Sequence, residues 1–133
     1  DVFSPGEHNG TFRGCQLSMI AGLAALEMTV EQDIPAQVRA KEKITKEYLE
    51  KEVKPLLKDE MEIRGIGLSW GIEFNDGKLA RAVLDKCFEK KLIIELAGSG
   101  DSVLKIMPSL VIEDDLLLKG FEIIKESIRE VLK

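Results

Sequence analysis

The chain has 133 residues, of which 44% are hydrophobic and 32% charged, a composition typical of a folded domain with a modest core. Its formal net charge of −5 argues against nucleic acid or an anionic membrane as the main partner, because both attract concentrated Lys and Arg. No apolar run approaches the roughly 20 residues of a membrane span, so no membrane partner is expected. One His and two separated Cys offer no metal site, and the thiols are expected to be reduced, as in a cytoplasmic protein.

The first residues carry turn signals, and an apolar stretch follows them. Ser4-Pro5-Gly6 and Asn9-Gly10 predict a loop over residues 1–13. Because the chain starts without Met inside this loop, we expect a fragment of a longer protein. From about residue 14 to 30, apolar residues recur at spacings of three and four with hardly any charge, which predicts a mostly buried helix.

The rest of the chain predicts helices and short strands in alternation. A heavily charged helix is expected over about 35–57, with Pro35 in its first turn. Residues 60–74 predict two short strands around Gly65-Ile66-Gly67, as a hairpin or a bulge. The later elements are a helix over 78–90, strands over 92–96 and 103–107, and a helix over 113–132. This order predicts an α/β (α+β) fold, with helices packed on one face of a short sheet.

The loop GEHNGTFRG (6–14) is the best candidate for a functional site. Its glycines expose backbone N–H groups before a helix N-terminus, where the helix dipole favours an anion. Thr11 adds a hydroxyl donor, and Arg13 adds a forked partner for phosphate or carboxylate. The plainer alternative is a turn followed by a helix cap. His8 is either a general base or an ordinary surface residue, since no Ser or Cys stands at motif spacing from it.

Lys105 is the second candidate, because it interrupts an apolar strand. With period-two alternation it shares a face with Val103 and Met107, and its ammonium could receive a substrate carboxylate. The alternative is an edge-strand lysine that reaches solvent. Glu73 and Glu95 also lie in apolar strands, where they are interpreted as ends that face water.

Three pieces occur in a distinctive order: GEHNGTFRG, RGIGLSWGIEF (64–74) and KLIIELAGSGDSVLKIMPSLVIEDD (91–115). Together they resemble the C-terminal part of class III aminotransferases, fold-type I enzymes that depend on pyridoxal 5′-phosphate (PLP). Within that family they are most similar to the branch that acts on diaminobutyrate in ectoine biosynthesis. Other members usually have Arg where Lys105 stands. The resemblance covers essentially the whole chain.

The resemblance implies a division of the chain and a role for each candidate residue. Residues 1–31 would be the end of a large domain, with an interface loop and a linking helix, and residues 32–133 the C-terminal small domain. The enzyme would be a homodimer or higher homo-oligomer in which Thr11, together with Gly10, reaches the PLP phosphate in the partner subunit. Gly10 stands where many relatives have Ser. Lys105 matches the position that binds the substrate carboxylate.

The resemblance also implies that the catalytic residues lie elsewhere. The Schiff-base lysine belongs to the N-terminal large domain, the chain's expected partner, so this chain alone should be inactive. The full enzyme is expected to exchange the 4-amino group between L-2,4-diaminobutyrate and glutamate, with aspartate semialdehyde and 2-oxoglutarate as the 2-oxo acid or aldehyde partners. The alternatives are an ornithine or 4-aminobutyrate aminotransferase, or a stand-alone, non-catalytic interaction domain. A bare apolar first helix would favour the fragment over the stand-alone domain.

Overall fold

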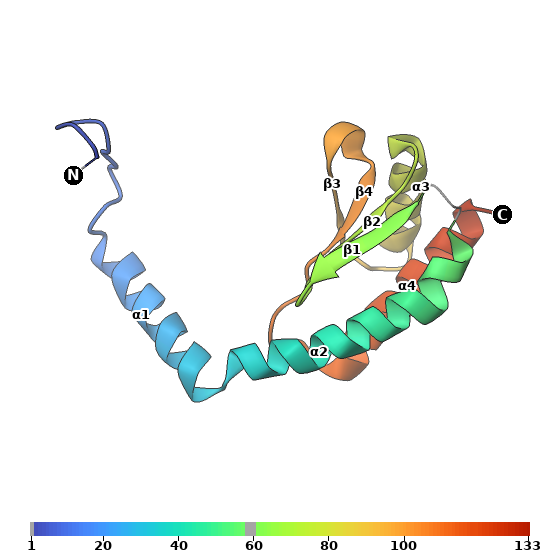
Figure 1. Ribbon diagram of the computed structural model, residues 1–133, viewed down its shortest axis with the longest axis horizontal. Helices are drawn as coiled ribbons and strands as arrows, with labels where there is room; N and C mark the ends of the chain where they lie inside the picture. Colours follow the sequence, from blue (N-terminus) through green and yellow to red (C-terminus); the bar gives the residue numbers. More distant parts are fainter. Residues whose placement is uncertain (1, 58–60) are drawn as a thin grey trace. The chain divides into compact units, whose positions relative to one another are not determined.

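The computed structural model describes residues 2–57 and 61–133, and its contacts divide the chain into two units. The first unit ends at Ile34 and holds a loop and helix α1 (Gln16–Glu31); the second unit begins at Pro35 and holds the sheet and its helices (Figure 1). None of the helices formed by the described residues has the length and apolar character that a membrane crossing requires.

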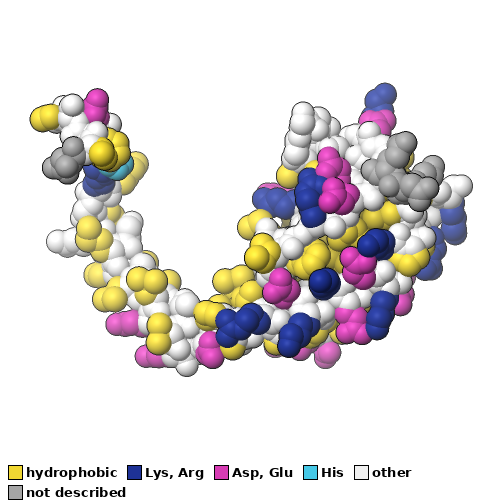
Figure 2. Space-filling view, in the orientation of Figure 1, with side chains coloured by type: hydrophobic (Ala, Val, Ile, Leu, Met, Phe, Trp, Pro, Cys, Tyr) yellow, Lys and Arg dark blue, Asp and Glu magenta, His cyan; other side chains and the backbone are white. Residues whose placement is uncertain are grey.

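Helix α1 is apolar on all sides, and hydrophobic side chains run along it in Figure 2. None of its described residues is buried, and the Leu17 side chain is 79% exposed. The sequence predicts a mostly buried helix here. The difference arises because the described part of the first unit contains no other helix or strand that could pack against α1. A helix that is apolar on all sides is normally buried. The exposed apolar surface of α1 is therefore of the kind that packs against another surface.

The second helix has the predicted extent but not a uniform geometry. It begins as α2 (Ile34–Tyr48), widens into a π-helical turn over Leu49–Val53 and tightens into a 3₁₀ turn over Lys54–Leu56. Pro55 has no N–H to donate to the preceding turn, which accounts for the change of geometry at this end. The π-helical turn leaves Leu49 and Val53 fully buried.

Four strands form one antiparallel sheet in the order β1-β2-β4-β3. The strands are β1 (Glu62–Ile66), β2 (Ser69–Glu73), β3 (Glu95–Ala97) and β4 (Val103–Ile106). The first two form the predicted hairpin, whose turn contains Gly67 at φ +58°. The Gly67 N–H donates to Oε1 of Glu42 at 2.9 Å, which ties the hairpin to α2. Because β4 lies between β2 and β3, the alternative that Lys105 lies on an edge strand is wrong.

Strand β3 begins later than the strand predicted over 92–96. Glu95 is paired with Lys105, and the same register would set Leu92 opposite Pro108. Proline has no N–H with which to extend the ladder. The Leu92 N–H donates instead to the carbonyl of Cys87, at 2.9 Å, at the end of the preceding helix.

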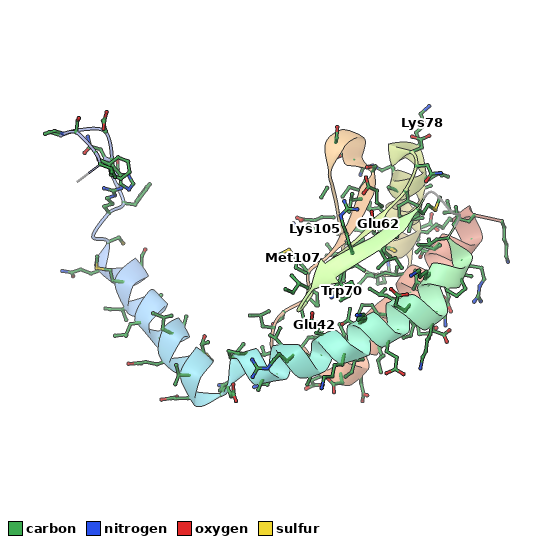
Figure 3. All side chains as sticks on the ribbon, viewed as in Figure 1. Glu42, Glu62, Trp70, Lys78, Lys105 and Met107 are labelled. Atoms are coloured by element: carbon green, nitrogen blue, oxygen red, sulfur yellow. The ribbon has the colours of Figure 1, made fainter. Side chains whose placement is uncertain are left out.

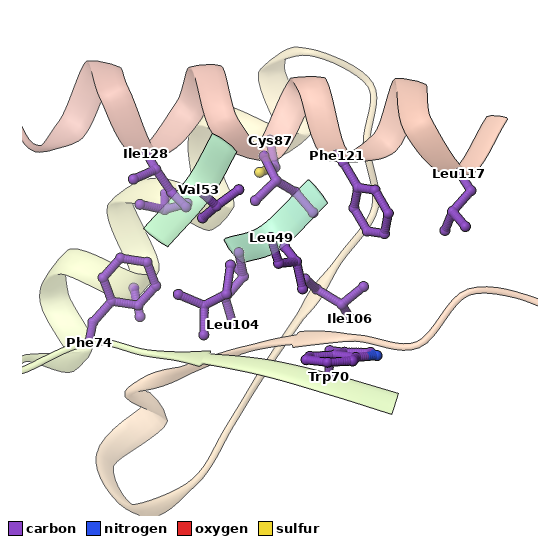
Figure 4. Close-up of a cluster of buried hydrophobic side chains, with 14 of the residues drawn as sticks. Leu49, Val53, Trp70, Phe74, Cys87, Leu104, Ile106, Leu117, Phe121 and Ile128 are labelled. Carbon is purple, nitrogen blue, oxygen red and sulfur yellow. The ribbon is translucent and has the colours of Figure 1, made fainter. Parts of the chain in front are cut away.

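Helices α3 (Gly77–Glu89) and α4 (Asp114–Val131) cover one face of the sheet together with the end of the second helix (Figure 4). Asp76 caps α3 by accepting a hydrogen bond from the Lys78 N–H at 2.9 Å. The core between sheet and helices is built from large apolar side chains, among them Leu49, Val53, Trp70, Ile72, Phe74, Leu104, Phe121 and Ile128. Since side chains alternate along a strand, the opposite face of the sheet carries the charged residues.

Candidate functional site

The loop before α1 is exposed and is organised by short-range hydrogen bonds. The Ser4 N–H donates to Oε2 of Glu7 at 2.6 Å, and Nδ2 of Asn9 donates to the Gly6 carbonyl at 3.0 Å. Further along, the Arg13 N–H donates to the Gly10 carbonyl at 3.1 Å. Each of these bonds joins residues three apart in the sequence.

Gly10 and Thr11, the predicted phosphate-binding residues, are consecutive and lie in the middle of this loop. Among the described residues, none of the loop's hydrogen bonds uses the Thr11 hydroxyl, so this group can donate to a ligand oxygen. A Cβ on Gly10 would stand 3.3 Å from Cγ of Arg13. The missing side chain at position 10 therefore makes room for the side chain of Arg13.

Arg13 is turned toward the loop itself. Its guanidinium donates to the His8 carbonyl and contacts the nitrogens of the His8 imidazole. The Phe3 ring lies 5.0 Å from the imidazole, between ring centroids. The arginine therefore closes the loop in this structure, and His8 serves as its partner.

Helix α1 starts immediately after the loop with an open N-terminus. The Cys15 side chain makes no capping hydrogen bond, and the first turn contains no acidic residue. The first backbone N–H groups of a helix have no intrahelical partner and favour an anion. A phosphate at the loop would therefore meet N–H groups and a hydroxyl, and this donor set fits a phosphate monoester. Cys15 itself is exposed, whereas Cys87 in the second unit is buried; both are free thiols.

Lys105 lies in the second unit, on the charged face of the sheet (Figure 3). Glu95 stands directly opposite it on β3, and Nζ of Lys105 lies 2.8 Å from Oε2 of Glu95. The Lys105 side chain is 36% exposed and that of Glu95 71% exposed. The hydrogen bond from the ammonium lowers the pKa of the Glu95 carboxyl below its ordinary value. Glu95 thus faces water, as the sequence predicts, but as the partner of the candidate lysine.

A second cation shares this face of the sheet. Arg64 of β1 and Lys105 of β4 are both paired in register with Gly71 of β2, one on either side. The Arg64 guanidinium forms ion pairs with Glu73 and Glu62. From sequence, Arg64 is interpreted only as part of a hairpin. Arg64 and Lys105 flank Gly71 because of the register of the three strands. The sequence contains no direct signal for that register.

A pocket of about 430 Å³ lies beside the ion pair, between α4 and the ends of β3 and β4. Its lining is mainly apolar and includes Leu92, Ile93, Met107, Leu116, Phe121 and Ile124, together with Lys105 and Glu95. In the sequence these residues fall in or beside the strands predicted over 92–96 and 103–107 and the helix predicted over 113–132. Their convergence depends on how α4 packs across the sheet.

Comparison with known proteins first gives the class of protein. The sequence profile of the family described as aminotransferase class-III matches residues 1–128, nearly the whole chain. The chain therefore belongs to the class III aminotransferase family. This confirms the resemblance expected from the three sequence pieces.

Individual relatives show which enzymes of the family this chain is similar to. The chain is 44% identical over 133 residues to the diaminobutyrate–2-oxoglutarate transaminase of Wolinella succinogenes, covering 100% of this chain and 31% of the relative. It is 36% identical over 132 residues to the enzyme of the same description from Streptomyces coelicolor, covering 98% of this chain and 31% of the relative. The chain thus spans 31% of the length of these curated relatives.

Solved structures share the fold. An acetylornithine aminotransferase from Elizabethkingia anophelis superimposes with a TM-score of 0.73 at 26% identity, covering 98% of this chain and 34% of that one. The ornithine aminotransferase from Toxoplasma gondii, crystallised with partial occupancy of PLP at its active site, gives a TM-score of 0.79 at 25% identity, covering 96% and 30%. The predicted fold class, helices on a small sheet as part of a PLP-dependent transferase, is confirmed.

Proposed function

We propose that this chain is the C-terminal part of an aminotransferase that exchanges the 4-amino group between L-2,4-diaminobutyrate and glutamate, with aspartate semialdehyde and 2-oxoglutarate as their oxo partners. This reaction would be the first step of ectoine biosynthesis. The observation that carries the proposal is the 44% identity, over the whole chain, to a diaminobutyrate–2-oxoglutarate transaminase. Bound PLP would supply the electron sink that amino-group transfer needs.

The division of labour proposed for this chain follows its two units. Residues 1–31 would end the large domain and carry the loop to the partner subunit of a homodimer, and residues 32–133 would form the small domain. Thr11 would donate its hydroxyl to the PLP phosphate, with the backbone at Gly10 beside it. The unengaged hydroxyl and the open N-terminus of α1 support this role. The cofactor-binding lysine would lie in the N-terminal large domain, so the chain alone would be inactive.

Lys105 would hold a substrate carboxylate in the second unit. A lysine binds a carboxylate as a point charge, without the fork geometry of arginine. The support is that the Lys105 side chain is partly exposed and that its ammonium already binds one carboxylate, that of Glu95. We also propose a cytoplasmic location, which the two free cysteines support.

Two alternative functions have weaker support. An ornithine or 4-aminobutyrate enzyme is supported by the structural likeness to the Toxoplasma gondii ornithine aminotransferase, but at 25% identity. A stand-alone interaction domain would be expected to cover its own apolar helix, yet no described residue of α1 is buried.

The test is the intact mass and activity of the native polypeptide that contains this chain. We expect a protein several-fold heavier than 14.8 kDa that carries bound PLP and releases glutamate from diaminobutyrate and 2-oxoglutarate. Ornithine and 4-aminobutyrate should be used at least about tenfold less efficiently, since one pocket difference contributes about 1–3 kcal/mol. A preference for either would replace the substrate assignment. A native species of 14.8 kDa without PLP would favour the stand-alone domain.

Replacing Thr11 tests the phosphate contact. In the full enzyme, Thr11→Ala should raise the dissociation constant of PLP by about tenfold, because a hydrogen bond to a charged group contributes about 1.5–3 kcal/mol. The measurement is PLP retention after dialysis. Thr29→Ala is the matched control, because the Thr29 hydroxyl already donates to the Ala25 carbonyl within α1, at 2.7 Å. Equal PLP retention in both variants would contradict the proposed contact.

A further inference from the structure

Arg13 is the only Lys or Arg in residues 1–34, the segment that forms the first unit. Within the described part of the chain, its guanidinium contacts the carbonyl and the imidazole of His8, and none of the ion pairs to a carboxylate uses it. Its partners are therefore neutral at pH 7, and the positive charge of Arg13 is not compensated in this structure.

The Arg13 side chain folds back over the turn that carries Thr11. The Arg13 N–H donates to the Gly10 carbonyl at 3.1 Å, which closes a turn over residues 10–13. A Cβ on Gly10 would stand 3.3 Å from Cγ, 3.6 Å from Cδ and 3.5 Å from Nε of Arg13, so the arginine side chain runs alongside Gly10. Its charge thus belongs to the same turn as the Thr11 hydroxyl.

We infer that Arg13 is a second ligand of the PLP phosphate, and that His8 holds its guanidinium until the phosphate is bound. The inference rests on the proposed function, which assigns the phosphate contact to Thr11 and to the backbone at Gly10. A guanidinium presents parallel N–H groups that match two phosphate oxygens. A hydrogen bond assisted by charge is roughly twice as strong as a bond between neutral groups. The phosphate therefore displaces His8 from the same N–H groups.

The charge of the cofactor gives Arg13 a task that the other donors of the loop cannot perform. A phosphate monoester carries about −1.5 to −2 charges at pH 7. The Thr11 hydroxyl and the first N–H groups of α1 donate hydrogen bonds but carry no formal charge. Arg13 is the cation that the first unit can bring to the phosphate.

A purely structural role is the alternative, in which Arg13 only braces the loop through His8. The two roles differ in what they require of His8. A brace needs the imidazole, so its removal would harm the loop as much as the removal of the arginine. A phosphate ligand does not need the imidazole, because His8 competes with the phosphate for the guanidinium.

The test measures the dissociation constants of PLP and of pyridoxal, which lacks the phosphate, on the full enzyme. Arg13→Gln keeps a polar side chain and removes the charge. Arg129→Gln is the matched control, because it removes the same charge from an exposed arginine in the last turn of α4. His8→Ala removes the imidazole and leaves the arginine in place.

We expect Arg13→Gln to raise the dissociation constant of PLP by about tenfold and that of pyridoxal by less than about twofold. The loss should shrink as the salt concentration is raised, because ions screen the exposed contact that the wild type makes. Arg13→Lys should recover part of the affinity, since lysine supplies the charge without the fork. His8→Ala and Arg129→Gln should bind PLP at least as tightly as the wild type.

Three results would overturn the inference: unchanged PLP binding in Arg13→Gln, an equal loss for PLP and pyridoxal in that variant, or an equal loss of PLP in His8→Ala. The last two would assign Arg13 to the shape of the loop. A wild-type enzyme that binds no PLP would refute the proposed function and the inference together. An enzyme that binds PLP but prefers another amino donor would refute only the substrate assignment, and the ratio of PLP to pyridoxal binding would still decide the role of Arg13.

Discussion

At the scale of single residues, a close approach of two strands constrains the hairpin that carries Arg64. Gly65 is paired with Trp70, and a Cβ on Gly65 would stand 2.4 Å from Cδ2 of Trp70 and 2.5 Å from the Ser69 carbonyl oxygen. The carbonyl is backbone and cannot move without a shift of the whole turn. Glycine is therefore required here by the close approach of two strands.

Gly65→Ala should lower the free energy of unfolding by about 1–3 kcal/mol, the usual cost of forcing an extra carbon into a packed site. Gly120→Ala is the matched control, because the nearest atom to its added Cβ would be Cδ1 of Leu92 at 4.0 Å and Gly120 lies within α4. That variant should be unchanged or more stable by up to about 1 kcal/mol. Unfolding in urea measures the free energy of unfolding of both variants. Equal stability of the two variants would mean that the hairpin relaxes around the new side chain.

The candidate residues differ in how far the sequence could predict them. Thr11 was identifiable because the loop, its glycines and the following helix are contiguous in sequence. Lys105 is identifiable as a charge in an apolar strand, but its partner Glu95 is not, because the sequence does not fix the register of β3 against β4. That register depends on which hydrophobic face of the strands is buried, and burial is a property of the folded chain.

At the scale of elements, the amphipathic helices were the most predictable. Helices α3 and α4 start and end within two residues of the predicted bounds, since their apolar stripes repeat over several turns. Strand β3 is not predictable to the same accuracy, because its pairing with β4 ends at Glu95 while the apolar run continues back through Ile94 and Ile93. The periodicity of the sequence also does not predict the π-helical turn at Leu49–Val53, which precedes Pro55 and its missing N–H.

Polar side chains link α2 to α4, and one of them, the Tyr48 phenol, has a shifted pKa. The Tyr48 hydroxyl donates to Oε1 of Glu122 at 2.5 Å, and Nζ of Lys125 lies 2.7 Å from Oε2 of Glu122 and 5.5 Å from the centroid of the Tyr48 ring. Partial burial, together with the adjacent Glu122 carboxylate, raises the pKa of Tyr48 to about 12. The fold therefore favours the neutral phenol.

Tyr48→Phe tests this network through pH. The folded pKa of Tyr48 lies above the unfolded value of about 10, so its contribution is complete below about pH 10 and is lost as the pH rises toward the folded pKa of about 12. At neutral pH the variant should be less stable by about 1 kcal/mol, the value of one hydrogen bond. The difference between wild type and variant in urea midpoint should shrink in alkaline buffer. A difference that stays constant with pH would place the phenol outside the network.

At the scale of the whole molecule, the two units differ in what they can bury. The second unit has a core shared by the sheet and three helical segments, with Phe121 and Ile128 at 1% and 0% exposure. The first unit has no buried position among its α1 residues, and its large apolar side chains lie on every side of that helix. The second unit thus contains a core of its own, whereas the described residues of α1 have no apolar cover within the first unit.

This contrast predicts the behaviour of the isolated chain. The 133-residue chain should self-associate, because contiguous exposed apolar patches larger than a few hundred Å² are rare on monomers. Residues 35–133 alone should sediment as a monomer. In the longer chain, the double substitution Ile20→Glu and Leu23→Glu should restore the monomer, since both residues are exposed on α1 and neither contributes to the core of the second unit. Sedimentation velocity separates the three cases. A monomeric 133-residue chain would show that α1 finds its cover within the chain, and the stand-alone domain would then become the better account of this protein.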